Sequence, residues 1–127
     1  MKHKDYYDAV ESARTKIQES SELTAAEKES IVTVGYGHIG DGDLHINVSF
    51  PGYENEDLMK RLNNIVYPHV MDFVRQRKGS VGAEHGMGVF NPPYLTYSKS
   101  AQMIGVMKLI KNGLDPNGIM NPYKVFP

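Results

Sequence analysis

Three segments of the chain carry apolar residues at the spacing of an α-helix. In residues 5–19, Tyr6, Val10, Ala13 and Ile17 recur at this spacing. A second stripe follows Asn55 and consists of Leu58, Leu62, Ile65, Val66, Val70, Phe73 and Val74. A third covers residues 98–112 and includes Met103 and Met107, which we expect to pack in the core. These patterns predict three helices, and Pro68 should kink the second or divide it in two.

Two shorter segments alternate between apolar and polar residues, as half-buried strands do. Residues 31–36 alternate through Val32, Val34 and Tyr36. In residues 44–50 the apolar side carries Leu44, Ile46, Val48 and Phe50, and the other side carries His45, Asn47 and Ser49. The Gly- and Asp-rich stretch between the two segments predicts a reversal, so the strands should pair and bring His38 close to His45.

The remaining segments predict loops and one short strand. Residues 20–30 are polar and predict a loop, in which Thr24 to Glu27 could cap a helical turn. Residues 80–83 predict a third strand, and Pro92-Pro93 argues against regular helix in residues 89–97.

The C-terminal end of the chain is rich in turn-forming residues. Gly113 is the predicted C-cap of the third helix, residues 115–118 a turn, and residues 121–124 an extended tail. Helices mixed with an antiparallel sheet that is covered on one side define an α+β fold.

Composition excludes several classes of protein. The 127 residues fit a single domain, 1–127, and a net charge of -1 offers no attraction for nucleic acid or an anionic membrane. The chain has no cysteine, so a metal would have to be bound by His, Asp or Glu. No apolar run approaches the ~20 residues of a transmembrane helix.

The histidines His38 and His45 are the first candidates for such chemistry. Glu84, next to His85 in a glycine-bracketed segment, could complete a set of two histidines and one carboxylate and leave a coordination position open. His85 would then stay off the metal as a base. The alternative is structural: His38 as a turn residue, and Glu84 and His85 as surface residues. His3 and His69 match no motif and are expected to be solvated.

Three segments in this order carry a family resemblance. They are His-Ile-Gly-Asp-Gly-Asp-Leu-His at 38–45, Gly-Ser-Val-Gly-Ala-Glu-His-Gly-Met-Gly at 79–88, and Leu-Asp-Pro-Asn-Gly-Ile-Met-Asn-Pro-Tyr-Lys at 114–124. Together they resemble the C-terminal part of the FAD-linked D-2-hydroxyacid dehydrogenases, a family that includes D-2-hydroxyglutarate and D-lactate dehydrogenases. The resemblance extends from about Tyr6 to the end of the chain.

The resemblance implies a partial ferredoxin-like cap domain, with the N-terminal FAD-binding domain absent from this chain. It implies oxidation of a small D-2-hydroxyacid by hydride transfer to FAD in the intact protein, with this segment inactive alone. A zinc or other divalent ion would be held by His38, His45 and Glu84, and Asn47 would bind the substrate. His85 would take the substrate's hydroxyl proton.

The family also suggests Asn121 and Lys124 as flavin contacts and the FAD domain of the same protein as a partner. It implies a soluble protein, mitochondrial in a eukaryote and cytoplasmic otherwise. The alternative function is a non-catalytic interaction module, as in relatives named for actin interaction. Unpaired sheet edges would favour homo-oligomers with either function.

Overall fold

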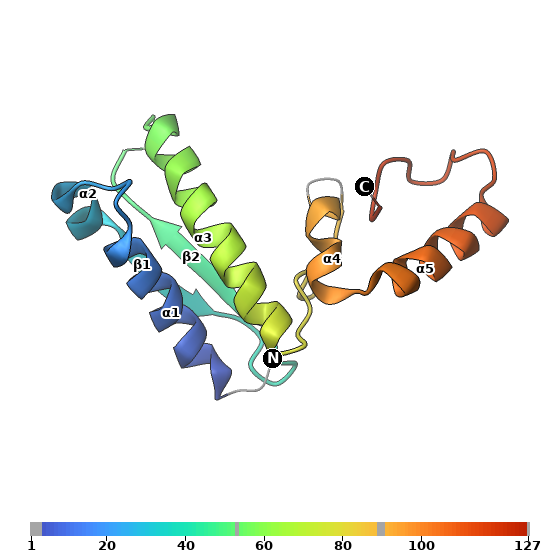
Figure 1. Cartoon of the computed structure of the whole chain (residues 1–127), viewed down its shortest axis with the longest axis horizontal. Helices are drawn as coiled ribbons and strands as arrows, with labels where there is room; N and C mark the ends of the chain where they lie inside the picture. Colours follow the sequence, from blue (N-terminus) through green and yellow to red (C-terminus); the bar gives the residue numbers. More distant parts are fainter. Residues whose placement is uncertain (1–3, 53, 89–90, 127) are drawn as a thin grey trace. The chain divides into compact units, whose positions relative to one another are not determined.

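The computed structural model describes residues 4–52, 54–88 and 91–126, and the chain divides into two compact units, one ending at Phe73 and one beginning at Val74. The first unit holds α1 (Asp5–Glu19), α2 (Ala25–Ser30), β1 (Val32–Tyr36), β2 (His45–Ser49) and most of α3 (Glu56–Gln76), as Figure 1 shows. The second holds the 3-10 helix η1 (Pro92–Tyr94), α4 (Leu95–Ser98) and α5 (Ala101–Leu114). The predicted α+β class is confirmed.

The two strands form an antiparallel pair. Val32 pairs with Ser49 and Tyr36 with His45, so the two strands agree with the predicted segments to within a residue or two. The predicted helix 5–19 is also confirmed, as α1.

Helices α1 and α3 cover one face of this pair (Figure 1). Their buried residues form one core, against which Val48 and Phe50 pack: Ile17, Leu23, Leu58, Leu62, Ile65 and Val66. At Gly35 of β1, helix α1 approaches so closely that an added Cβ would collide with the side chain of Val10. The sheet is therefore covered on one side, as predicted.

The apolar residues of β1 lie on the uncovered face. Val32, Val34 and Tyr36 are 54%, 44% and 56% exposed, whereas Thr33 is 3% exposed. Directly opposed residues of an antiparallel pair share a face, so the register places Val34 beside Asn47 and Tyr36 beside His45. The face that carries the candidate site residues therefore also carries an apolar strip.

Residues 25–30 are a short helix, α2, where most of the segment was predicted to be a loop. The capping turn is confirmed: the Thr24 hydroxyl accepts from the backbone N–H of Glu27, and the Glu27 carboxylate accepts from that of Thr24. Arg61 of α3 also stabilises α2, because its guanidinium donates to the Glu27 carboxylate at 2.6 Å and to the carbonyl of Glu22 at 2.6 Å. A charged contact between distant segments thus stabilises a helix too short to persist on propensity alone.

Glu27→Gln is expected to reduce the acid dependence of stability. The Arg61 guanidinium and the backbone N–H of Thr24 lower the pKa of Glu27 from its ordinary 4.5 to about 2. A lowered carboxyl pKa stabilises the folded state fully above pH 4.5, and this contribution is lost as the pH falls toward 2. Thermal unfolding between pH 2 and 7 should show a lower Tm at neutral pH for the variant, and a flatter slope between pH 4.5 and 2. Glu29→Gln, an exposed position on the same helix, is the control, and equal slopes in all three proteins would contradict the prediction.

Helix α3 continues through Pro68, so of the two predicted outcomes, a kink or a division, the division does not occur. Proline removes one backbone hydrogen bond and disfavours the preceding turn. Here Leu62 and Ile65 before the proline and Val70 after it pack in the same core. This packing stabilises the helix on both sides of the proline.

The predicted third strand does not form. Residues 83–85 are a turn, in which the backbone N–H groups of His85 and Gly86 donate to the carbonyl of Gly82, and Ala83 has a φ of 41°. The N–H of Val81 donates to the hydroxyl of Ser98 at 2.8 Å. Because side-chain and local partners satisfy these groups, the segment has no need of a neighbouring strand.

Part of residues 89–97 is helical, contrary to prediction. Pro92 and Pro93 start η1, and α4 follows at once with Leu95 buried; residues 89–90 lie outside the described part. Proline is tolerated in the first turn of a helix, where its missing N–H would be unpaired in any case.

Helix α5 starts at Ala101, with Ser100 as N-cap, and ends at Leu114, so Gly113 lies inside it and the C-cap is Asp115. None of its residues is buried in the described structure. Met103 is exposed and Met107 half-buried, so the prediction of core packing is wrong for Met103. The exposed apolar residues of this helix are Met103, Val106, Leu109, Ile110 and Leu114.

The chain turns back after α5. The predicted turn at residues 115–118 is confirmed by the hydrogen bond from Gly118 N–H to the Asp115 carbonyl. The buried Asp115 carboxylate accepts from the N–H groups of Ile119 and Met120 and from Lys111, which holds its pKa below the ordinary value. These contacts bend the segment, and residues 121–125 form turns and bends instead of the predicted extended tail.

Candidate metal site

Two backbone hydrogen bonds close the reversal between β1 and β2. The carbonyl of His38 accepts from the N–H groups of Asp41 at 3.0 Å and Asp43 at 3.2 Å. A Cβ at Gly37 would collide with the backbone carbonyl of Asp43, so the loop requires glycine there. Asp41 and Asp43 thus belong to the turn, as predicted.

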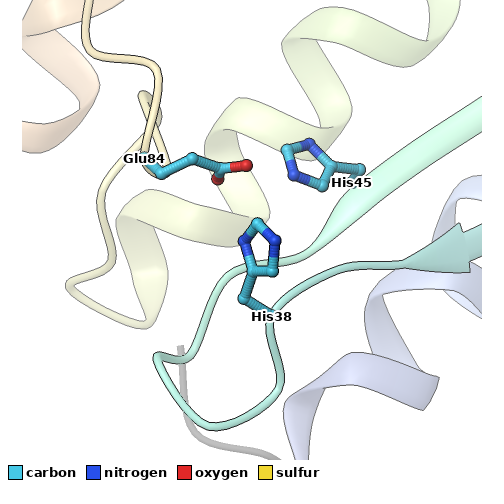
Figure 2. Close-up of side chains that lie close together, drawn as sticks. All are labelled: His38, His45 and Glu84. Atoms are coloured by element: carbon cyan, nitrogen blue, oxygen red, sulfur yellow. The ribbon is translucent and has the colours of Figure 1, made fainter.

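This loop brings His38 and His45 together. Their ring centroids lie 6.3 Å apart with the planes at 87°, and one ring nitrogen of each lies within 4.8 Å of the other (Figure 2). The side chain of His38 is exposed and that of His45 half-buried at the start of β2. Two imidazoles with nitrogens this close suit a metal ion that accepts nitrogen ligands.

Asn47 lies two residues beyond His45 on the same uncovered face of β2. Its amide Nδ2 donates to the hydroxyl of Tyr36 at 2.8 Å, and the Tyr36 ring lies 5.8 Å from the His45 ring. The predicted shared face of His45 and Asn47 is therefore observed. Tyr36 was predicted only as part of a strand pattern, although pairing residues 31–36 with 44–50 places it opposite His45.

Glu84 and His85 lie in the second unit, in the turn that follows α3, and Figure 2 labels Glu84. The Nε2 atom of His85 is 3.4 Å from the Glu84 carboxylate, and both residues are exposed. Adjacent acid and base groups are thus presented by one short turn.

Asn121 and Lys124 lie close together at the end of the second unit. The Lys124 ammonium donates to the Asn121 side-chain oxygen at 3.4 Å, and both residues are exposed. Asn121 has a φ of 47°, a left-handed conformation that asparagine tolerates better than most residues.

His69 differs from its prediction. It is half-buried on α3, and its Nε2 lies 2.6 Å from the hydroxyl of Ser12 on α1, so it links two helices instead of being solvated. His3 lies outside the described residues.

Comparison with known proteins identifies the class. The family model for the C-terminal domain of FAD-linked oxidases matches residues 4–125, so the chain belongs to that family. This confirms the resemblance carried by the three sequence motifs. Within the described ranges, no helix combines the length and apolar character needed to cross a membrane.

Three relatives illustrate the family. A mitochondrial D-2-hydroxyglutarate dehydrogenase of Arabidopsis thaliana is 44% identical over 74% of this chain and 16% of its own length. A Saccharomyces cerevisiae protein named as a D-2-hydroxyglutarate–pyruvate transhydrogenase is 36% identical over 95% of this chain and 23% of its own. A Schizosaccharomyces pombe protein, named as a mitochondrial D-lactate dehydrogenase, is 40% identical over 93% of this chain and 22% of its own length. The chain thus spans about a fifth of the length of these relatives.

Proposed function

We propose that this chain is the metal-binding segment of an FAD-dependent dehydrogenase that oxidises a D-2-hydroxyacid to the 2-oxoacid. The family and the names of its relatives support the reaction, with 2-hydroxyglutarate or lactate as the substrate. The observation that carries the proposal is the His38–His45 pair, since its two ring nitrogens lie within 4.8 Å of each other. The location that we propose is the mitochondrion, which the names of two of these relatives include.

His38, His45 and Glu84 would hold a divalent ion. Two imidazoles and a carboxylate are a donor set that zinc accepts, with room left for a substrate oxygen. Such an ion would lower the pKa of the substrate's hydroxyl group as a Lewis acid. The role of Glu84 follows from its place in the second family motif, and its neighbour His85 is the remaining base.

The other residues handle the substrate and its proton. Asn47 would hydrogen-bond a substrate oxygen from the face that carries His45. The imidazole of His85 would take the hydroxyl proton as a general base. A bound flavin would supply the acceptor for the hydride of the substrate's α-carbon. Asn121 and Lys124, exposed side by side, would contact the flavin, and the FAD-binding part of the same protein would be the partner.

Zinc binding by the purified chain tests this proposal. After equilibration with excess zinc and desalting, we expect about one zinc ion per chain, as three protein ligands predict. Glu84→Gln should weaken the affinity, measured against a chelator, because the amide is a poorer ligand than the carboxylate. Glu54→Gln is the control at a position outside the motifs. Zinc content near zero in the original chain would contradict the metal site.

A protein-interaction module is the second candidate function. The observation that favours it is the exposed apolar surface of α5, which includes Leu109, Ile110 and Leu114. Such a module has no requirement for metal, so the zinc measurement separates the two candidates.

A further inference from the structure

Tyr36 touches two residues of the candidate site with different parts of its side chain. Its hydroxyl accepts from the Asn47 amide at 2.8 Å, and its ring lies 5.8 Å from the His45 ring at an interplanar angle of 38°. All three residues belong to the β1–β2 pair, and Tyr36 is directly opposite His45 in the register. The contacts thus arise within one hydrogen-bonded pair of strands.

The hydroxyl determines how Asn47 presents its amide. Asn47 is exposed, and an exposed amide can rotate freely about its last torsion. Donation to Tyr36 commits one N–H of Nδ2, which directs the second N–H and the carbonyl oxygen in definite directions. An amide held in this way binds a ligand at lower entropic cost than a freely rotating one.

The ring determines how His45 is oriented. A centroid distance of 5.8 Å and a tilted arrangement lie within the range of favourable aromatic pairs. Cross-strand neighbours of this kind restrict each other's rotamers on an uncovered sheet face. A histidine ligand whose ring is held by a neighbour binds metal more tightly than one that must be ordered on binding.

We propose that Tyr36 is a positioning residue of this site, which orients the Asn47 amide through its hydroxyl and the His45 imidazole through its ring. The inference rests on the proposed function, in which His45 binds the metal and Asn47 binds the substrate. Its two contacts can be separated by substitution, because Tyr36→Phe removes only the hydroxyl and Tyr36→Ala removes the ring as well.

The first measurement is the nitrogen-15 NMR spectrum of the side-chain amides in the metal-free chain, with the Asn47 signal assigned by its loss in Asn47→Asp. Tyr36→Phe should move the Asn47 signal toward that of a solvated amide and speed its exchange with water. Tyr7→Phe, an exposed tyrosine on α1, is the matched control and should leave it unchanged. An Asn47 signal that is the same with and without the Tyr36 hydroxyl would overturn the inference, whether or not the chain binds metal.

The second measurement is zinc affinity by competition with a chelator. Tyr36→Phe should stay within about twofold of the original, and Tyr36→Ala should bind zinc about tenfold more weakly, the lower end of what supporting residues contribute to metal sites. Equal affinity in all three, with zinc bound by the original, would overturn the role of the ring while the proposed metal site stands. If the original chain takes up no zinc, the proposed function fails and the Asn47 signal alone decides the role of Tyr36. Because Tyr36→Phe keeps the ring, it remains informative if Tyr36→Ala fails to fold.

Discussion

His45→Ala is expected to weaken zinc binding by more than about 100-fold. Loss of a residue that only supports a metal ligand already costs about 10–100-fold in affinity, so loss of a ligand itself should cost more. His45 is half-buried at the start of β2, and its ring meets that of His38 edge-on across the reversal. The measurement is zinc content after desalting, followed by competition with a chelator of known affinity.

His69→Ala is the matched control for this substitution. It removes an imidazole of the same unit that contacts Ser12 between two helices and is not part of the candidate ligand set. We expect it to leave zinc affinity unchanged while lowering stability slightly. Parallel loss of zinc in both variants would indicate a general effect of folding, and retention of zinc by His45→Ala would remove His45 from the ligand set.

Ile17→Ala is expected to lower the free energy of unfolding of the first unit by about 2–5 kcal/mol, the usual range for truncating a buried isoleucine. Ile17 is 1% exposed and belongs to the core that joins α1 to α3. Since small domains are stable by only about 5–15 kcal/mol, this change removes a large fraction of the total. Denaturation by urea, followed by circular dichroism, measures the difference.

Ile39→Ala provides the comparison in the same unit. Its side chain is 62% exposed in the reversal, so its truncation leaves no cavity, and the midpoint in urea should barely move. Similar losses for the two isoleucines would show that the core cluster is not what stabilises this unit.

Strong periodicity identifies helix α1 and both strands of the first unit from sequence. The helix 5–19 and the two strands are predictable because each buries a face against the rest of the unit, and burial leaves its period in the sequence. The His38–His45 pair is predictable for a local reason: few residues separate the strands, and Gly and Asp favour a tight reversal. The three motifs are each a short continuous segment, so the sequence alone is enough to indicate the C-terminal domain of FAD-linked oxidases.

Segments without a burial pattern could not be predicted in this way. Residues 83–85 form a turn in which the carbonyl of Gly82 accepts from the N–H groups of His85 and Gly86, and the N–H of Val81 just before it donates to Ser98. The bend after α5 depends on the buried Asp115 carboxylate. Such contacts join particular atoms, so they produce no periodic spacing of apolar residues in the sequence. The stripe in α5 has helical spacing, yet spacing alone does not say whether anything covers it, and in the described structure none of its residues is buried.

The sequence by itself determined α1 and the two strands of the first unit, the polar face shared by His45 and Asn47, and the family. Only the tertiary structure decided that α1 and α3 cover the face opposite the site, which leaves Val32, Val34 and Tyr36 exposed beside it. It also decided the contact of Tyr36 with Asn47 and His45. The physical reason is that alternation defines two faces of each strand, whereas the choice of the covered face depends on register and on the helices that pack there.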